Sequence, residues 1–264
     1  MNILYSGDSG IREGIIMSAL SLARYSHPLN IYILTSFYKM KGIDSDFALR
    51  LEEKLKEKNP ENRVTLIDVT EEFKKNFPVK NSRTRFTPAC MLRLFADKIP
   101  SLPDEILYLD ADVICTAPPH ITLDMAGVEV AGVLDRYGKY FFRRFPFKMS
   151  YMNSGVLFLN LDEIRKTGLF ERCRERCKKK KMFMPDQSAI NREVKRKILL
   201  PRRFNEQKSV REDTVFRHFT TCFSLRGKIS VKPWQIEKMH SVLKEYRFDD
   251  LYSELKESQK EIMK

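Results

Sequence analysis

The stretch ILYLDADVICTAP, residues 106–118, is an apolar run that leads into two aspartates one residue apart and ends in a loop of small residues and proline. Successive side chains of an extended segment point to opposite faces, so Asp110 and Asp112 emerge on the same side of a strand or of its exit. Two carboxylates held this close repel each other unless a positive charge lies between them. A hard divalent cation is the obvious candidate.

The residues alone leave three interpretations of this pair open. In the first, Asp110 and Asp112 hold a divalent ion that also binds diphosphate oxygens, since carboxylates suit Mg²⁺ or Mn²⁺. In the second, they are the nucleophile and general acid of a haloacid-dehalogenase-like phosphatase, whose aspartates also follow a buried strand. In the third, they only cap a turn before Pro118. The phosphatase motif normally follows the first strand, whereas more than a hundred residues precede it here, which counts against the second interpretation.

The N-terminal segment predicts a strand, a turn, a helix and a second strand, in the order NILYS, SGDSG, IIMSALSLA and LNIYILT. Such a unit implies a parallel strand pair, with the turn that bears Asp8 at the carboxyl end of the sheet, where open α/β sheets bind ligands. Further elements are expected as helices over 44–58, 88–98 and from Gln235 onward, and as strands over 64–69, 106–110, 128–135 and 152–161. This alternation favours an α/β doubly wound domain.

Composition indicates a globular protein without a membrane span. The chain has 264 residues, 42% of them hydrophobic, which is enough for one large α/β domain. No apolar stretch approaches the roughly 20 residues that cross a bilayer, and MNILYSGD does not resemble a secretion signal. The five cysteines show no regular spacing, and Cys173 and Cys177 lack two further zinc ligands at recognisable spacing. We therefore expect a cytoplasmic protein with reduced thiols.

The net charge of +13 is unevenly distributed along the chain. Residues 136–181 hold fourteen Lys or Arg against four Asp or Glu, whereas residues 1–135 hold sixteen against nineteen. This asymmetry suggests an anionic partner, and phosphates of a small molecule, anionic lipid headgroups and nucleic acid would all fit it. A nucleic-acid-binding protein is the weaker hypothesis, because no helix-turn-helix, RNA-binding strand motif or zinc finger is present and the aspartate pair would stay unexplained.

Three further clusters of polar residues are candidates for binding or catalysis. Asn153 and Ser154 are expected in a small polar turn at the head of a buried strand, where they could hold sugar hydroxyls or only shape the turn. Asp186 and Gln187 follow Pro185 at a helix start, where Asp186 could equally be an N-cap. In the third cluster, His218 could be a ligand or a core histidine, and the KPW tripeptide that begins at Lys232 could bind an anion or anchor the C-terminal helices.

Taken together, the order of Asp8, Arg93, LYLDADV, NSGV, PDQ, His218 and KPW resembles the retaining glycosyltransferases of family 8, which includes glycogenin and bacterial lipopolysaccharide galactosyltransferases. These motifs span residues 3–234, and the bacterial surface-polysaccharide members resemble the chain most. The resemblance implies a single α/β domain of the GT-A fold over residues 1–234, with a mixed central sheet, and a C-terminal helical extension over residues 235–264. It also implies transfer of a hexose from a UDP-sugar to a glycan or lipid-linked acceptor in lipopolysaccharide or capsule synthesis.

The resemblance also implies a set of site residues. Asp110, Asp112 and His218 would hold the metal, with Mn²⁺ favoured over Mg²⁺ by the nitrogen ligand. Asp186 and Gln187 would be catalytic. The nucleotide sugar would be bound by Ser6, Asp8, Arg93, Asp110, Ala111, Asp112, Asp135, Asn153, Ser154 and Lys232.

Two positions depart from the family pattern. Ile11 stands where the family usually has an aromatic residue that stacks on uracil. His218 and Lys232 are fourteen residues apart, whereas the family spaces its histidine and KPW closely. The aromatic and cationic stretch YFFRRFPFK, residues 140–148, is expected to contact the acceptor or an anionic membrane, or to place aromatics in the core with arginines extending outward. No nucleic-acid partner is expected.

Overall fold

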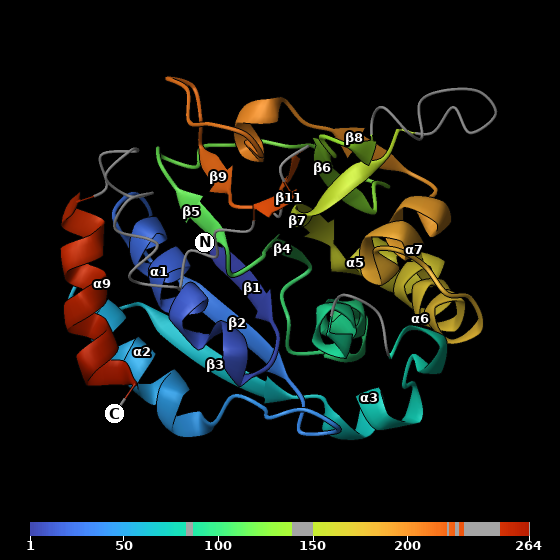
Figure 1. Ribbon diagram of the computed structural model, residues 1–264, viewed down its shortest axis with the longest axis horizontal. Coiled ribbons are helices and arrows are strands. Elements are labelled where there is room, and N and C mark those ends of the chain that lie inside the picture. Colours follow the sequence, from blue (N-terminus) through green and yellow to red (C-terminus); the bar gives the residue numbers. More distant parts are fainter. Residues whose placement is uncertain (83–86, 139–149, 221, 225–226, 230–248, 264) are drawn as a thin grey trace.

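A seven-stranded mixed sheet forms the centre of the molecule in the computed structural model (Figure 1). The structure describes residues 1–82, 87–138, 150–220, 222–224, 227–229 and 249–263. The strand order is β3-β2-β1-β4-β7-β6-β8. The strands are β1 (Asn2–Ser6), β2 (Asn30–Thr35), β3 (Arg63–Asp68), β4 (Glu105–Leu109), β6 (Val130–Leu134), β7 (Met152–Asn160) and β8 (Lys197–Leu199).

Strand direction places several loops at one edge of this sheet. β1 pairs in parallel with both β2 and β4, so the predicted parallel pair is confirmed and the loops after β1 and β4 leave the same edge. β7 is antiparallel to β4 and to β6. The start of β7 therefore lies beside the ends of β4 and β6, which brings residues 8, 110, 135 and 153 to one edge of the sheet.

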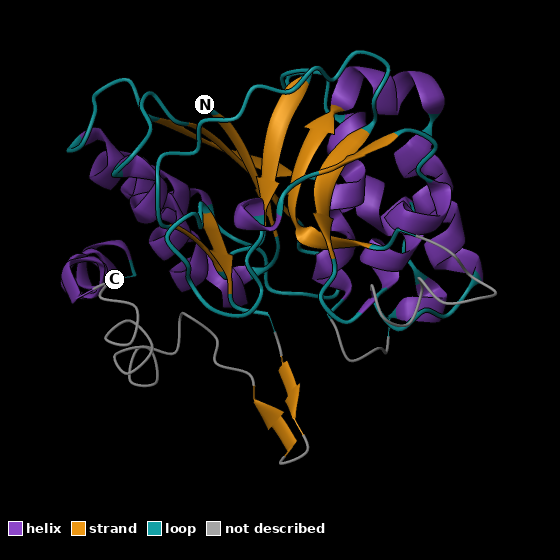
Figure 2. Ribbon diagram, turned by 90° about the horizontal axis from the view of Figure 1, so that it is seen from above, coloured by secondary structure: helices purple, strands orange, loops and turns teal. Residues whose placement is uncertain are grey.

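Helices cover both faces of the sheet (Figure 2). One face packs against α1 (Arg12–Ala23), α2 (Ser45–Lys56) and α9 (Asp249–Ile262). The other face packs against α3 (Thr70–Lys75), the 3₁₀ helix η3 (Pro88–Lys98), α5 (Leu161–Thr167), α6 (Leu169–Lys179) and α7 (Pro185–Glu193). Alternate strand residues serve the two faces: Ile3 and Tyr5 join the first core and Leu4 joins the second. This is the period of two that a buried strand requires.

Local signals in the sequence account for the ends of several helices. The Asp44 carboxylate accepts a hydrogen bond from the Phe47 amide at the start of α2, and Asn160 caps α5 through the Glu163 amide. Gly168, with φ of 66°, ends α5 in the left-handed conformation that favours glycine. The expected helix over 88–98 is present as the 3₁₀ helix η3 rather than an α-helix.

Two short ladders and three short helices complete the description. β5 (Val113–Cys115) pairs antiparallel with β9 (Phe216–His218), and β10 (Cys222–Ser224) with β11 (Gly227–Ile229). Three further 3₁₀ helices are η1 (Ser9–Ile11), η2 (Val79–Asn81) and η4 (Arg202–Phe204). Sequence analysis predicted neither ladder.

The C-terminal helix α9 packs on the domain. Its Leu251 and Leu255 are buried in the core beside α1, and its Glu254 pairs with Arg24 at 3.2 Å. The proposed boundary between residues 234 and 235 lies outside the described residues and stays a prediction. In the described part of the chain, no helix combines the length and apolarity needed to cross a bilayer. The cysteines that can be assessed there, Cys90, Cys115, Cys173 and Cys177, are free thiols.

Candidate active site

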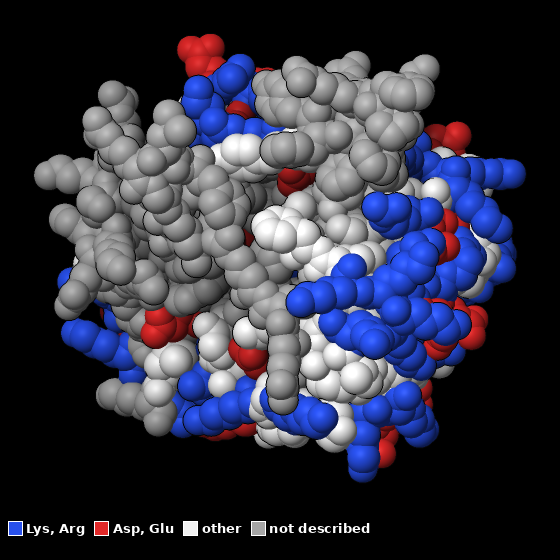
Figure 3. Space-filling model, turned by 45° about the vertical axis from the view of Figure 1, so that its right-hand side comes forward, with Lys and Arg blue, Asp and Glu red and all other residues white. Residues whose placement is uncertain are grey.

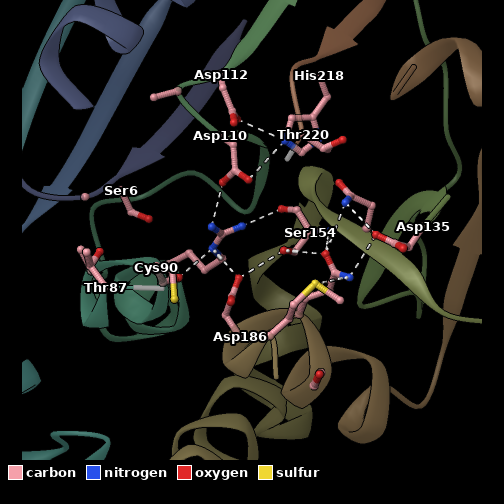
Figure 4. Close-up of a pocket in the computed structure, with 18 of the residues that line it drawn as sticks. Ser6, Thr87, Cys90, Asp110, Asp112, Asp135, Ser154, Asp186, His218 and Thr220 are labelled. Carbon is pink, nitrogen blue, oxygen red and sulfur yellow. Dashed lines mark hydrogen bonds and ion pairs between the residues drawn. The ribbon is translucent and has the colours of Figure 1, made fainter. Parts of the chain in front are cut away.

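A pocket of about 860 Å³ opens at the edge of the sheet where β1 and β4 end. Every predicted site residue that the structure describes lines it (Figure 4): Ser6, Asp8, Arg93, Asp110, Ala111, Asp112, Asp135, Asn153, Ser154, Asp186, Gln187 and His218. Lys232, like the stretch 140–148, lies outside the described residues. The structure thus brings together residues that span more than 200 positions of the chain, while their individual roles stay predictions.

Three of these side chains form a group that could hold a metal ion. Asp110, Asp112 and His218 each offer a ligand atom, and these atoms lie within 4.8 Å of one another. His218 Nε2 lies 3.1 Å from Asp112 Oδ1 and 3.7 Å from Asp110 Oδ2. Two carboxylates and an imidazole nitrogen are a suitable ligand set for a divalent ion such as Mn²⁺ or Mg²⁺. The residues therefore fit the metal that the sequence predicts.

The fold explains why a histidine more than a hundred residues away reaches the aspartates. The ladder between β5 and β9 places Val113 opposite His218. It continues where the Phe219 amide donates to the Asp112 carbonyl at 2.9 Å. Asp110 precedes this ladder, at the exit of β4, where its amide donates to the Gly155 carbonyl at 2.8 Å. Backbone pairing, rather than side-chain contact alone, thus brings the three groups together.

Arg93 already compensates part of the negative charge of the aspartates. Its guanidinium contacts Asp110 Oδ1 at 2.8 Å and Asp186 Oδ2 at 3.3 Å, and it donates to the Ser154 carbonyl at 2.6 Å. Burial alone would lower the pKa of Arg93, but the neighbouring carboxylates outweigh it and the net shift is upward. The third interpretation of the aspartates, a simple turn cap, does not describe these contacts.

The pocket lining is strongly anionic. Its carboxylates are Asp8, Asp110, Asp112, Asp135 and Asp186, and Arg93 is the sole Lys or Arg among the described lining residues. An anionic nucleoside diphosphate would be repelled from such a surface. A divalent cation held by Asp110, Asp112 and His218 would offset two of the negative charges. Binding of the cation would therefore favour binding of the diphosphate, and the diphosphate would favour binding of the cation.

Gln187 organises the opposite wall of the pocket. Its Oε1 accepts from the Ser154 amide at 3.0 Å, and its Nε2 donates to Asp135 Oδ2 at 3.2 Å. Asp186 accepts from the Ser154 hydroxyl at 3.2 Å. The N-cap of α7 is Met184, so the alternative of Asp186 as an N-cap is wrong. Asn153 and Ser154 lie inside β7 rather than in the expected turn, because β7 begins at Met152.

Two further groups of the pocket, the Cys90 thiol and the Tyr151 hydroxyl, are held in their neutral form by raised pKa values. Burial and the nearby charge of Asp186 raise the pKa of the Cys90 thiol well above its usual value. Burial raises the pKa of Tyr151 to about 12. Cys90 is therefore a protonated thiol at neutral pH and a weak nucleophile.

The first loop forms the remaining wall. The Asp8 carboxylate accepts from the Gly10 amide at 3.0 Å and caps η1, so part of its role is local structure. Ile11 follows in the same short helix and lines the pocket. An aliphatic side chain thus lies where the family pattern has an aromatic one.

Two residues support His218: Asn205, which sequence analysis missed, and Gly155, which it expected only in a small polar turn with Asn153 and Ser154. Asn205 is fully buried, and its Oδ1 lies 3.2 Å from His218 Nδ1. Gly155 lies under the imidazole ring, and a Cβ there would be 2.0 Å from His218 Cε1. The NSGV motif contained a signal for Gly155, but nothing in the local sequence PRRFNEQ distinguishes Asn205.

Solved structures share this fold. Galactosyltransferase LgtC, in a complex with donor and acceptor sugar analogues, superposes with a TM-score of 0.70 at 17% identity, covering 96% of this chain and 95% of that chain. Glycosyltransferase GlyE of Streptococcus pneumoniae gives 0.65 at 20% identity, covering 97% of this chain and 62% of that chain. The fold is that of the GT-A glycosyltransferases.

A family model gives the narrower assignment. The model described as glycosyl transferase family 8 matches residues 2–235, and the chain belongs to that family. A lipopolysaccharide 1,2-glucosyltransferase of Escherichia coli K12 is 25% identical over 274 residues, covering 94% of this chain and 76% of the relative. A second Escherichia coli protein of the same name is 26% identical over 193 residues, covering 58% of this chain and 57% of its own length. The protein is therefore a glycosyltransferase, and the phosphatase alternative finds no support.

Proposed function

We propose that the protein transfers a hexose from a UDP-sugar, with retained anomeric configuration, to a glycan or lipid-linked acceptor in lipopolysaccharide or capsule synthesis. The observation that carries this proposal is the possible metal-binding group of Asp110, Asp112 and His218. It lies in a pocket that three further aspartates also line. Lipopolysaccharide as the destination is supported by the names of the two relatives.

The proposed chemistry places the diphosphate at the triad and the sugar at the Gln187 wall. A bound Mn²⁺, or Mg²⁺ in its place, would act as a Lewis acid that stabilises negative charge on the departing diphosphate. Arg93 holds the Asp110 carboxylate in place through a partly buried ion pair. We propose that Ser6, Asp8 and Ala111 contact the nucleoside side of the donor, and that Lys232 adds a cation at the diphosphate.

On the sugar side, we propose that Asp135, Asn153 and Ser154 bind hydroxyl groups, and that Asp186 and Gln187 lie at the reacting carbon. The amide of Gln187 is a poor nucleophile, and both its ends are engaged with protein groups. A covalent intermediate on this residue is therefore disfavoured. Attack of the acceptor hydroxyl on the face that the diphosphate leaves would retain configuration, with a phosphate oxygen accepting the proton.

A thermal-shift screen tests this proposal. UDP-, GDP- and CMP-sugars are each added with and without Mn²⁺, and the melting temperature of the folded protein is measured. We expect the largest rise with a UDP-sugar and Mn²⁺ together, because ligands at about 100 times their dissociation constant stabilise by roughly 2.7 kcal/mol. A better response to GDP- or CMP-sugars would contradict the UDP assignment, and no response to any of them would contradict the donor class.

We also propose that the protein works as a peripheral protein at the cytoplasmic face of an anionic membrane. Lys and Arg side chains gather over the side of the molecule that carries α6 and α7 (Figure 3). At the end of α6, Lys178 and Lys179 share the single carboxylate of Glu175. Lys180 and Lys181 are exposed and form no ion pair with any described residue. Two residues further on, Phe183 is 65% exposed and lines the pocket.

Flotation with vesicles tests the membrane contact. Vesicles of phosphatidylglycerol and of phosphatidylcholine are compared for the wild type, for Lys180→Glu/Lys181→Glu and for the control Lys256→Glu/Lys260→Glu. The control makes the same charge change on α9, at the other end of the molecule (Figure 1). We expect the first pair alone to lose about tenfold or more of the binding to the anionic vesicles, since each basic residue near the surface contributes about 1 kcal/mol. Equal loss in both variants, or no binding by the wild type, contradicts the proposal.

A further inference from the structure

We infer that Asn205 is a positioning residue that selects the imidazole tautomer of His218 with which a metal ion can be bound. The tautomer follows from the chain's own hydrogen bonds, and its importance for metal binding rests on the proposed function. A chain of hydrogen bonds runs from the Gly155 backbone amide, which can only donate, through the side-chain amides of Asn153 and Asn205 to the imidazole ring.

The first step fixes the orientation of Asn153. The Gly155 backbone amide lies 3.0 Å from Asn153 Oδ1, and an N–H can only donate, so the facing atom must be the amide oxygen. At its other end, Asn153 Nδ2 lies 3.0 Å from Asp135 Oδ2, a carboxylate oxygen that accepts. Both ends of Asn153 therefore demand the same orientation.

The second step fixes Asn205. One end of the Asn205 side-chain amide lies 2.9 Å from Asn153 Oδ1. Because that oxygen can only accept a hydrogen bond, the facing group of Asn205 must be its NH₂. The Asn205 oxygen then faces His218 Nδ1 at 3.2 Å. That oxygen can only accept, and Nδ1 must therefore carry the proton.

The proton on Nδ1 decides the state of the other ring nitrogen, Nε2. In a neutral imidazole with a proton on Nδ1, Nε2 carries a free lone pair. His218 Nε2 is the atom that faces Asp110 and Asp112. The lone pair thus points to the place where a cation would lie between the three groups. The opposite tautomer would direct an N–H there and would oppose metal binding.

Burial makes this arrangement costly to change. Asn205 is fully buried, and Asn153 and His218 are 6% and 4% exposed, so water is poorly placed to replace the missing partner. The arrangement also links the triad to the opposite wall, because Asp135 Oδ2 accepts from both Asn153 and Gln187. Partners of metal-bound histidines of this kind typically change metal affinity by 10–100-fold when they are removed.

The test compares Asn205→Leu, Asn205→Asp and the control Asn191→Leu. Asn191 is an equally buried amide on α7 that bonds the Met152 backbone and does not touch His218. Mn²⁺ affinity is measured by calorimetry on the whole protein. The tautomer is read from the ¹⁵N shifts of the His218 ring, assigned by loss of its signals in His218→Gln. These spectra are taken without metal at increasing pH until the ring signals no longer change, so that the neutral imidazole is observed.

We expect Asn205→Leu to weaken Mn²⁺ binding by about 10–100-fold and to lose the pure Nδ1–H tautomer. Asn205→Asp should keep both, because its carboxylate still accepts from Nδ1, but it should be less stable, because its second oxygen would face Asn153 Oδ1 where the wild type has an NH₂. Asn191→Leu should lower the melting temperature without changing either readout. Wild-type tautomer and affinity in Asn205→Leu, or an equal loss of affinity in Asn191→Leu, would overturn the inference. Loss of sugar transfer with intact Mn²⁺ affinity would concern the proposed function instead.

Discussion

Replacement of Asp112 by asparagine should reduce sugar transfer roughly 100-fold or more, comparable to the loss of one preorganised electrostatic group in other active sites. Asp112 is buried, and its carboxylate lies 3.1 Å from the His218 imidazole. The amide keeps the shape of the side chain but removes a negatively charged metal ligand. The measurements are initial rates of transfer and of UDP-sugar hydrolysis in Mn²⁺, together with Mn²⁺ affinity.

The stability of the same variant separates a metal role from a structural one. Without metal, Asp112→Asn removes one of two neighbouring carboxylates, so its free energy of unfolding should equal or exceed that of the wild type. The stabilisation that Mn²⁺ and UDP give the wild type should be lost. Full activity in the variant, or stabilisation by Mn²⁺ and UDP equal to that of the wild type, would show that Asp112 does not act as a ligand.

Asp110 is a less decisive position for this experiment. Its carboxylate binds the buried Arg93 guanidinium at 2.8 Å and accepts from the Tyr108 hydroxyl at 2.8 Å. Asp110→Asn would therefore leave Arg93 with weaker compensation as well as removing a metal ligand. Loss of activity is expected there too, but the two causes would not be separated.

The sequence predicted the parts of the fold that depend on local pattern. Buried strands and the helix α2 follow from residues that are close in the chain. The triad was reached by resemblance, since no spacing rule connects His218 to Asp110 and Asp112. Its structural basis is the ladder between β5 and β9, two strands of three residues each, whose pairing depends on the rest of the fold.

Long-range ion pairs and hydrogen bonds account for what sequence reasoning missed. The interpretation that Asp110 and Asp112 need a cation between them overlooked Arg93, which lies seventeen residues earlier and contacts Asp110 directly. The role of Asn205 depends on three side chains from different elements. Only coordinates show that they form one connected path, because each residue type is common in loops and turns.

Replacement of Gly155 by alanine should weaken Mn²⁺ binding and sugar transfer by about tenfold or more. The new Cβ would lie 2.0 Å from His218 Cε1 and 2.5 Å from Nδ1, so the buried ring would have to move. Positive φ angles among the described glycines occur at Gly127 and Gly168, so Gly155 is required by space and not by backbone conformation. Overpacking of this kind typically costs about 1–3 kcal/mol, and the displaced ring also loses its position relative to Asp112.

Gly132→Ala provides the matched control for that change. Gly132 is buried in the neighbouring strand β6, and a Cβ there would lie 2.9 Å from Leu157 Cδ2. This atom is the end of a flexible apolar side chain that is not a metal ligand. Gly132→Ala should lose less thermal stability than Gly155→Ala, because a leucine methyl can shift more easily than a buried ring, and Gly155→Ala alone should lose Mn²⁺ affinity measured by calorimetry. Equal metal affinity in both variants would mean that the ring position of His218 does not control the site. A metal defect specific to Gly155→Ala would show that the glycine of NSGV leaves room for the His218 imidazole ring.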